Sequence, residues 1–486
     1  MKILKEILYK VSTEGVFGST LVKISSLSFD SRNIKKNSLY VAKKGIHLDG
    51  HDFIKKSIEK GAAAIVCNKL PEEVIDGITY IIVNNTSKAL GILASNFYDN
   101  PSEKLNLVGI TGTNGKTSVA FFLHQLFSSH SLKCGLLSTI KIKYLDREFN
   151  NSSTTPDIIT INNLLNDMVK EGVDFCFMEV SSHGIAQDRI YGLSFKAGVF
   201  TNLTHDHLDY HGNFKNYRDT KKQFFDNLSD SAFALTNIDD KNGSFMLQNT
   251  KAKKYTYATK FHADYMVKIL ECEFSGMLLK IQNHEVWSSL IGHFNSQNLL
   301  AVYAIADLFK IPTLNILKYI SQLRSADGRF QSFQTKDKIT IVVDYAHTPD
   351  ALKNILETIN NIRTNNEILY LILGCGGNRD KQKRPLMGKI ATDLCDKVIF
   401  TSDNPRDEDP LKIISEMIAG VESENYKKFI KVTLREEAIA MAGQLSKKGD
   451  IVVIAGKGHE RYQEINGKRY PFNDTEVAHK IFLNTD

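Results

Sequence analysis

The chain has 486 residues, of which 42% are hydrophobic and 24% are charged, and its formal net charge is +6. This length exceeds what a single hydrophobic core organises, so we expect about two to four domains. The mild positive charge is spread along the sequence, which argues against a nucleic-acid-binding protein. No apolar run approaches the ~18 residues of a membrane span, so we expect no transmembrane segment.

The six cysteines are far apart in the sequence and show no C-x-x-C spacing. Several stand in apolar runs such as DFCFMEV, where small buried thiols are common. The first residues, MKILKEILYKVSTEG, lack the apolar core and the small-residue cleavage site of a signal peptide. We therefore expect a cytoplasmic protein with reduced thiols and no structural zinc, and we expect a monomer.

Short apolar runs and turn signals alternate through the first hundred residues. LYVAKKG, AAAIVCN and ITYIIVN predict strands, and HDFIKKSIEKG predicts a helix that ends at Gly61. A helical stretch, ALGILASNFY, is followed by the polar segment YDNPSEKLN (98–106), which is typical of a linker. We place a first domain at residues 1–100.

A stronger α/β rhythm begins at Leu105. LNLVGITG predicts a strand that ends in glycine, TSVAFFLHQLFSS predicts a helix, and VDFCFMEVSS, AGVFTNL and AFALTNID predict buried strands. Strands that are apolar on both faces indicate a parallel sheet covered by helices. We place this central domain at residues 101–327.

The last third of the chain predicts a second doubly wound unit, at residues 328–486, with its boundary near SADGRF (325–330). KITIVVDYAHTPDAL, EILYLILGCGG, KVIFTS and DIVVIAGKG contain its strands, and DALKNILETINNI is one of the helices between them. The predicted fold class is therefore α/β, with a parallel-rich central sheet and a Rossmann-like C-terminal domain.

The segment VGITGTNGKTS (108–118) resembles a phosphate-binding loop between a strand and a helix. Backbone N–H groups around Gly112 and Gly115 could face phosphate oxygens at the positive end of the helix dipole. Lys116 would reach the terminal phosphates, and the hydroxyl of Thr117 could bind Mg²⁺. The strict motif has glycine where this chain has Ile110, so a plain strand–turn–helix junction with a solvent-facing lysine stays open.

Two later predicted strands end in metal-binding side chains. In FMEVSSHG, Glu179 stands at the carboxyl end of one predicted strand, and His207 follows TNLTHD just beyond another. Ligands of parallel sheets lie at this edge, so the two side chains could hold a second metal ion. His205 and His211 add a zinc alternative, which the absence of an H-E-x-x-H spacing disfavours.

Eight motifs occur in order between about Asp30 and Asp474: TGTNGKTS, EVSSHG, TNLTHDHLDYHG, GHFNSQN, DYAHTPDAL, GCGGNRDKQKRPLMG, DNPR and AGKGHE. On these motifs the chain resembles the Mur ligases, and within them the tripeptide-synthetase branch. In that family the phosphate loop has the spacing found here. The resemblance implies three domains, which bind a uridine nucleotide, ATP and an amino acid.

The resemblance also implies a reaction in peptidoglycan precursor synthesis. ATP, with Mg²⁺, would phosphorylate the terminal carboxylate of UDP-N-acetylmuramoyl-L-alanyl-D-glutamate, and a diamino acid would then attack the acyl phosphate. Phosphate is a good leaving group, and cations must offset the repulsion between the anions that meet.

The family implies roles for residues of the central site. Lys116, Glu179, His207 and Lys221 would be catalytic, and Thr117, Glu179 and His207 would bind the metal. Lys221 falls where the family carries a carbamylated lysine, although a surface lysine beside Lys222 remains an alternative. ATP would contact Gly112, Thr113, Asn114, Gly115, Lys116, Thr117, Ser118, Asn298, Arg329 and Asp344. Asp327 stands where the family usually has proline.

The same resemblance implies contacts with the nucleotide sugar. These residues are Ser31, Thr154, Thr155, Ser181, Gln187 and Arg189, whose hydroxyl, amide and guanidinium groups suit carboxylate and pyrophosphate. SFDSR and GIHLDGHDF match segments around the uridine, and ordinary turn chemistry is the alternative there.

TSDNPRDEDP indicates which amino acid is added. Arg406 could bind the distal carboxylate of meso-diaminopimelate bidentately, whereas L-lysine would bring an ammonium to the guanidinium. The matching family positions are Arg379, Asp403, Asn404, Arg406, Gly456 and Glu460. The alternatives are an Arg406 paired with its own neighbouring acids, an L-lysine-adding ligase, a folylpolyglutamate-type or muropeptide-recycling ligase, and a non-catalytic nucleotide switch.

Overall fold

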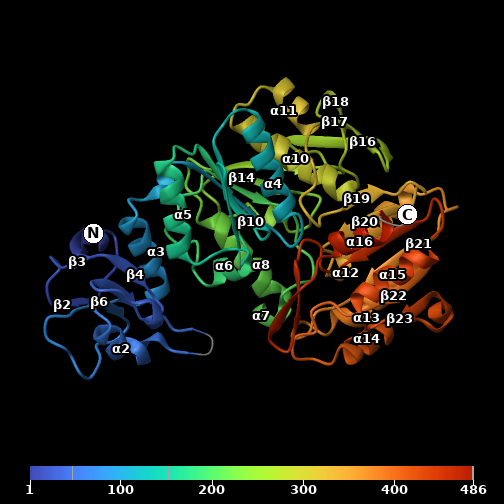
Figure 1. The fold of residues 1–486 in the computed structure, drawn as a ribbon. Helices are drawn as coiled ribbons and strands as arrows, with labels where there is room; N and C mark the ends of the chain where they lie inside the picture. Colours follow the sequence, from blue (N-terminus) through green and yellow to red (C-terminus); the bar gives the residue numbers. More distant parts are fainter. Residues whose placement is uncertain (46–47, 152, 484–486) are drawn as a thin grey trace.

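The computed structural model describes residues 1–45, 48–151 and 153–483. Its three principal sheets follow one another along the chain and form three lobes, with the central lobe between the other two (Figure 1). Ile46 and His47 of the GIHLDGHDF segment and Ser152 of the SSTTPD segment lie outside the described residues. No helix in the described ranges is long and apolar enough to cross a membrane.

The N-terminal lobe is built on a sheet with the order β2-β7-β6-β5-β4. The strands from β4 to β7 pair in parallel, and β2 closes one edge in the antiparallel sense. Its elements are β1 (Lys2–Ile3), α1 (Leu4–Ile7), β2 (Gly15–Phe17), β3 (Lys23–Ile24), β4 (Ser26–Ser28), η1 (Ser31–Asn33), β5 (Ser38–Val41), η2 (Gly50–Phe53), α2 (Ile54–Glu59), β6 (Ala62–Cys67), β7 (Thr79–Ile82), α3 (Thr86–Phe97) and η3 (Pro101–Glu103). The predicted strands and the helix before Gly61 are confirmed.

The central lobe holds a sheet with the order β11-β10-β9-β12-β8-β13-β14-β15-β16-β17-β18. Its strands from β9 to β16 in this order pair in parallel, which confirms the predicted parallel-rich sheet. Its strands are β8 (Asn106–Thr111), β9 (Cys134–Leu137), β10 (Lys141–Tyr144), β11 (Arg147–Asn150), β12 (Phe175–Glu179), β13 (Ala197–Phe200), β14 (Phe233–Asn237), β15 (Lys253–Ala258), β16 (Tyr265–Glu273), β17 (Gly276–Ile281) and β18 (His284–Ser288). Its helices are α4 (Lys116–Ser129), α5 (Ile158–Lys170), α6 (Ser182–Ala186), α7 (Leu208–His211), α8 (Phe214–Asp226), α9 (Gly243–Met246), α10 (His293–Leu308) and α11 (Thr313–Ile320).

Two apolar clusters cover the two faces of the central sheet. One packs α4 and α10 against the strands through residues such as Phe127 and Leu299, and the other packs α5 and α8 through Leu165 and Phe225. Strands buried on both faces explain the continuous apolar runs in the sequence. This arrangement leaves the carboxyl ends of β8, β12 and β13 as the edge where polar side chains collect.

The C-terminal lobe is a doubly wound unit with the sheet order β19-β20-β24-β21-β22-β23. All its pairings are parallel except that of the edge strand β19. Its elements are β19 (Gln331–Gln334), β20 (Thr340–Asp344), α12 (Pro349–Ile362), β21 (Leu369–Leu373), α13 (Lys383–Leu394), β22 (Lys397–Phe400), α14 (Pro410–Ile418), η4 (Ser423–Lys428), β23 (Phe429–Lys431), α15 (Arg435–Leu445), β24 (Ile451–Ala455), β25 (Tyr462–Ile465), β26 (Lys468–Pro471) and α16 (Asp474–Phe482). The predicted Rossmann-like alternation is confirmed, and the β25–β26 hairpin is an addition to it.

Candidate functional site

The loop from Gly112 to Gly115 joins the end of β8 to the start of α4, as expected for a phosphate-binding loop. Both glycines have positive φ angles, 152° and 84°. A Cβ on Gly112 would lie 1.9 Å from Thr201 Oγ1, so the neighbouring strand leaves no room for a side chain. Lys116 Nζ folds back over the loop and donates to the carbonyl oxygens of Gly112 (2.9 Å) and Thr113 (2.6 Å). The alternative of a solvent-facing lysine is therefore wrong.

Lys221 of α8 reaches the same loop. Its side chain is 1% exposed, and Nζ donates to Gly112 O at 2.8 Å. Burial, followed by the charge of Lys116, holds the pKa of Lys221 well below its usual range. Lys222 instead pairs with Asp226 one helical turn further on. The alternative of a surface lysine at position 221 is wrong.

The carboxylate of Glu179 lies at the end of β12 and is fully buried. It accepts hydrogen bonds from the backbone N–H of Thr139 (2.7 Å) and from its hydroxyl (3.1 Å). Among the described residues Glu179 forms no salt bridge. A buried carboxylate without a cationic partner is costly, so this position suits a bound cation.

His207 stands at the N-cap of α7 with a φ of 53°. Desolvation in the cleft lowers the pKa of its imidazole, against the opposing effect of Asp206. His205 instead lies 3.4 Å from Asp380 of the C-terminal lobe. Across the described ranges, no three His, Cys, Asp or Glu side chains are arranged to hold a metal ion by themselves. This geometry does not support the zinc alternative.

Asp206 lies inside the TNLTHDHLDYHG motif but is not among the predicted site residues. Its Oδ2 lies 3.4 Å from His207 Nε2. Burial opposes ionisation of Asp206, but the nearby His207, His347 and Lys383 lower its pKa, as does Lys116. The signal in the sequence was present, because an acid between two histidines follows a strand end.

The other predicted ATP residues surround the loop from three directions. Asn298 of α10 is buried, and its Oδ1 would lie 2.7 Å from a Cβ on Gly115. Arg329 crosses from the C-terminal lobe and donates from Nη2 to Thr117 Oγ1 at 3.3 Å. Asp344 ends β20, and burial raises its pKa to about 6, although it accepts two backbone N–H bonds.

The remaining loop residues are held by neighbours. Thr113 Oγ1 lies 3.0 Å from Tyr217 Oη, and Ser118 is buried on the first turn of α4. Asn114 donates from Nδ2 to Asp350 Oδ2 of the C-terminal lobe at 3.0 Å. The loop is therefore in contact with the C-terminal lobe at two points.

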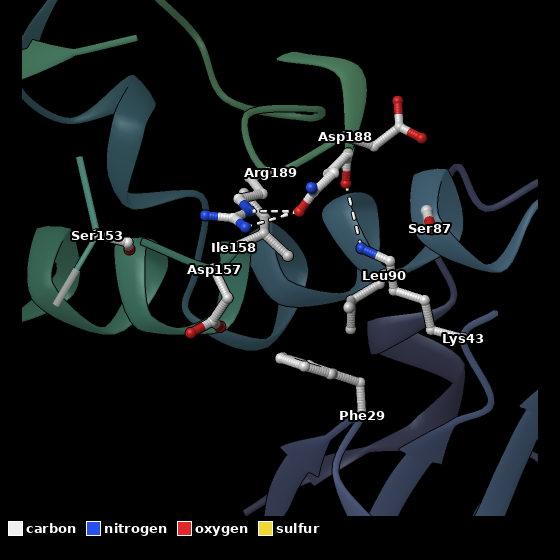
Figure 2. Close-up of a pocket in the computed structure, with 10 residues that line it drawn as sticks. Phe29, Lys43, Ser87, Leu90, Ser153, Asp157, Ile158, Asp188 and Arg189 are labelled. Atoms are coloured by element: carbon white, nitrogen blue, oxygen red, sulfur yellow. Dashed lines mark hydrogen bonds between the residues drawn. The ribbon is translucent and has the colours of Figure 1, made fainter. Parts of the chain in front are cut away.

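A cavity of about 270 Å³ lies where the N-terminal lobe, with its helix α3, meets α5 and the segment after α6 in the central lobe (Figure 2). Its lining includes two predicted residues, Gln187 and Arg189, and the aromatic ring of Phe29. Lys43 was not predicted; its Nζ donates to Gln187 O at 3.1 Å, and burial followed by the charge of Arg189 lowers its pKa. Ser31 follows shortly after Phe29, in η1, but does not line the cavity.

Hydroxyl groups connect this cavity to Glu179. Thr155 Oγ1 donates to the carbonyl of Glu179 (2.9 Å) and accepts from the backbone N–H of Ser181 (3.0 Å). Thr154 Oγ1 lies 3.1 Å from the hydroxyl oxygen of Thr139, and this hydroxyl donates to Glu179. Arg189 Nη1 donates to the carbonyl of Thr155 at 2.7 Å. The predicted nucleotide-sugar residues of the central lobe thus form a path from the cavity to Glu179.

The predicted amino-acid residues meet at the carboxyl ends of β21, β22 and β24. A Cβ on Gly376 would lie 3.0 Å from Arg406 Nη1 and 3.7 Å from Arg379 Cγ, so the guanidinium of Arg406 and the stem of Arg379 both lie beside this glycine. Asn404 Nδ2 donates to Glu460 Oε2 at 2.7 Å. Gly456 has a φ of 114°, and a Cβ there would lie 2.6 Å from Asp403 Oδ2.

Arg406 does not pair with the acids that follow it. Its Nη1 donates to Gly377 O at 2.8 Å, and its Nε lies 3.6 Å from Glu464 Oε2. Asp407 and Glu408 bind other groups, including both the backbone and the side chain of Asn378. The alternative of a self-paired loop arginine is wrong.

Two further residues of this cluster were not predicted. Lys457 is fully buried and donates to Asn404 Oδ1 (3.1 Å) and Glu460 Oε2 (3.0 Å). Glu464 lies on β25, whose short polar strand gives no local signal of a long-range contact. Lys457 was within reach, since it stands inside the AGKGHE motif.

Three family models match the chain in order. The Mur ligase family catalytic domain matches residues 23–98, the Mur ligase middle domain matches residues 110–306, and the Mur ligase glutamate ligase domain matches residues 328–458. Together they cover most of the sequence and all three sheets.

Curated relatives match the full length. UDP-N-acetylmuramoyl-L-alanyl-D-glutamate–2,6-diaminopimelate ligase of Cytophaga hutchinsonii is 49% identical over 479 residues, which is 98% of either chain. The protein of the same name from Bacillus licheniformis is 39% identical over 493 residues, which is 99% of either chain.

Solved structures agree in fold. A structure of a ligase of that name is 30% identical, with a TM-score of 0.70 over 99% of this chain and 98% of the other. MurF ligase from Thermotoga maritima in complex with ADP has a TM-score of 0.64 at 18% identity over 94% of this chain and 96% of the other, which is a likeness of fold alone. From the matched domains and the full-length relatives, this chain belongs to the Mur ligase family.

Proposed function

We propose that the protein is an ATP-dependent ligase that adds meso-diaminopimelate to UDP-N-acetylmuramoyl-L-alanyl-D-glutamate in peptidoglycan precursor synthesis. The observation that carries this is the pair Arg379 and Arg406 beside Gly376, at the strand ends of the C-terminal lobe. The guanidinium of Arg406 at this point suits the distal carboxylate that diaminopimelate carries and L-lysine lacks, and the aliphatic stem of Arg379 lies beside it. The names of the full-length relatives agree with this choice of amino acid.

ATP binds at the loop 112–118 in this proposal. Backbone N–H groups of the loop and the N-terminus of α4 face its phosphates, and Lys116 leaves the two carbonyl oxygens it now contacts to reach the terminal phosphate. Asn298 lies beside the loop, where it would contact the adenine. The carboxylate of Asp344 would accept a hydrogen bond from a ribose hydroxyl.

The residues at this site fit a magnesium ion. Magnesium is bound through few protein ligands together with phosphates and water, and Thr117 and Glu179 supply oxygen ligands, with an imidazole at His207. The buried carboxylate of Glu179 lacks an ion-pair partner in the described part of the chain, which favours a cation there. Bound at this position, Mg²⁺ would neutralise part of the phosphate charge.

Lys221 is proposed to be carbamylated. Its lowered pKa increases the fraction of neutral amine, which can attack CO₂, lose a proton and form a carbamate. Modification replaces a buried amine beside Lys116 with an anion, so the two side chains attract each other.

The nucleotide sugar is proposed to span the cavity of Figure 2 and the row of hydroxyl groups that leads from it to Glu179. Ser31 lies on the uridine side, Arg189 and Gln187 lie in the cavity, and Thr154, Thr155 and Ser181 continue towards Glu179. This course brings the terminal carboxylate of the substrate to the phosphate loop.

The chemistry then has two steps. An oxygen of the carboxylate attacks the γ-phosphorus of ATP, the bond to the β-phosphate oxygen breaks, and ADP leaves. The amine of diaminopimelate attacks the acyl carbon, a C–N bond forms, phosphate departs with the former carboxylate oxygen, and the nitrogen loses a proton. Lys116 stabilises the charge on the transferring phosphoryl group by electrostatic attraction.

Heavy-oxygen labelling tests this sequence of steps. The terminal carboxylate of the nucleotide substrate is labelled, and the released phosphate is analysed by mass spectrometry. One labelled oxygen per phosphate is expected, together with a product extended by one diaminopimelate. Unlabelled phosphate would rule out the acyl phosphate.

The cellular setting is proposed to be the cytoplasm, where ATP is supplied. All six cysteines are free thiols, and five of them are buried, as in a reducing compartment.

A further inference from the structure

The loop that carries Arg406 is fastened to the β25–β26 hairpin. Arg406 has a φ of 52°, and its backbone N–H donates to Glu464 O at 3.0 Å. Its carbonyl accepts from the N–H of Asn466 at 2.8 Å. Two more bonds join Gln463 Nε2 to Asp403 O (2.6 Å) and the N–H of Glu464 to Asn404 Oδ1 (2.9 Å). The hairpin therefore determines where the side chain of Glu464 lies relative to the loop.

The carboxylate of Glu464 stands beside the guanidinium of Arg406. Oε2 lies 3.6 Å from Nε, and the two side chains are 25% and 19% exposed. Within the described residues this carboxylate makes no hydrogen bond. It is therefore a half-buried acid with one loose partner.

Glu460, the acid named by the family motif, is already engaged. Its Oε2 accepts from Asn404 Nδ2 (2.7 Å) and from the buried ammonium of Lys457 (3.0 Å). Arg469, the cross-strand neighbour of Glu464, stacks on the ring of Tyr462, with 4.4 Å between its guanidinium carbon and the ring centroid. Of the two acids, Glu464 has the greater capacity for a new cation.

The distal carbon of meso-diaminopimelate carries a carboxylate and an ammonium on the same centre. The carboxylate and the ammonium are attached to the same carbon, so a carboxylate bound at Arg406 holds the ammonium close to the guanidinium. The carboxylate of Glu464 lies beside the same guanidinium. Resting on the proposed function, we infer that Glu464 binds the distal ammonium of diaminopimelate, so that Arg406 and Glu464 together recognise the zwitterionic centre. L-Lysine would satisfy only Glu464, and a substrate without the distal amine would satisfy only Arg406.

The test combines one substitution with one substrate change. Glu464→Gln keeps the size of the side chain and removes its charge, and L-aminopimelate keeps both carboxylates and lacks the distal amine. kcat/KM is measured for both substrates with both enzymes. A hydrogen bond to a charged group predicts that Glu464→Gln lowers kcat/KM for meso-diaminopimelate about tenfold and changes that for L-aminopimelate less than about twofold.

Two variants complete the design. Glu424→Gln removes one exposed acid from η4 and should leave both values unchanged. Glu464→Asp restores the charge and should recover part of the preference for diaminopimelate. A misfolded fraction would lower kcat/KM for both substrates by the same factor. The ratio of the two kcat/KM values therefore reports recognition and not folding.

Equal losses with the two substrates, or no loss with diaminopimelate, would overturn the inference. Wild-type enzyme also has to prefer diaminopimelate to L-aminopimelate by about tenfold. Turnover by the wild type distinguishes failure of the inference about Glu464 from failure of the proposed function. An enzyme that used neither substrate would contradict the inference and the proposed function together.

Discussion

Lys116 and Lys221 donate to the same acceptor, the carbonyl oxygen of Gly112. Burial lowers the pKa of both lysines, and the charge of Lys116 lowers that of Lys221 further, because two ammonium groups this close repel each other. An anion or a modification would relieve this repulsion. The phosphates of ATP would engage one lysine, and a carbamate would convert the other.

Replacement of Lys221 tests this explanation. We expect Lys221→Ala to lower kcat by at least about 100-fold, because an electrostatic group of the site is lost. A short carboxylic acid such as acetate should restore part of the rate by occupying the space of the carbamate. Phosphate release with increasing acetate measures the effect.

The adjacent lysine is the matched control. Lys222 pairs with Asp226, away from Gly112, so Lys222→Ala should keep most of its activity and gain nothing from acetate. If acetate rescued the Lys222 variant, the modified residue would be Lys222. If acetate did not rescue the Lys221 variant, the proposed carbamate at Lys221 would be contradicted.

At the scale of elements, α13 ties two specificity loops together. Arg384, fully buried on α13, donates to Glu408 (3.0 Å), to Glu416 of α14 (2.6 Å) and to Gly376 O (3.1 Å). Glu408 also accepts from the N–H of Asn378 at 2.6 Å. The loops of Arg379 and Arg406 therefore share one ionic support.

Glu408→Gln tests that support. The hydrogen bond from Arg384 lowers the pKa of Glu408 to about 2. Because the folded pKa is depressed, the ionised carboxylate contributes stability above about pH 4.5, and this contribution is lost as the pH falls towards 2. We expect the variant to lose about 2 kcal/mol of unfolding free energy at pH 7.

Urea unfolding of the two proteins at several pH values measures this difference. The gap between wild type and the Gln variant should narrow as the pH falls below about 4.5. A gap that is independent of pH would mean that the ionised form of Glu408 is not what supports the loops.

The parts of the site that could be predicted are those in which a residue follows an apolar strand. Glu179 ends β12 and Asp344 ends β20, and both strands are continuous apolar runs in the sequence. Glu464 could not be predicted in this way, because β25 is short and partly exposed along its length. Its role depends on a contact with a loop almost sixty residues earlier, for which no local pattern exists.

The antiparallel parts of the fold were also missed. β16 to β18 mix buried and exposed residues along their length, and α10 packs against β16. Parallel strands covered on both faces leave a strong apolar signal, whereas half-exposed hairpins leave a weak one.

In the whole molecule, the C-terminal lobe contributes contacts to the proposed ATP site. Arg329 contacts Thr117, and Asp350 contacts Asn114, across the boundary between the lobes. Both central residues belong to the phosphate loop, so nucleotide binding has to exchange these bonds for contacts with ATP. Binding should therefore couple the loop to the position of the C-terminal lobe.

Thermal unfolding measures this coupling. MgATP at a hundredfold excess over its Kd should stabilise the folded protein by about 2.7 kcal/mol. The Lys116→Met variant should lose most of this stabilisation by MgATP. Without nucleotide, the variant should unfold near the wild-type temperature. A shift of equal size in the variant would mean that ATP does not bind through this loop.

The most direct test of the account is phosphate release with ATP, Mg²⁺ and UDP-N-acetylmuramoyl-L-alanyl-D-glutamate, with meso-diaminopimelate and L-lysine added in parallel. We expect release with diaminopimelate and little with lysine, because Arg406 meets a carboxylate in one and an ammonium in the other. Release with lysine at the same rate would contradict the role of Arg406, and release with neither would contradict the proposed ligase.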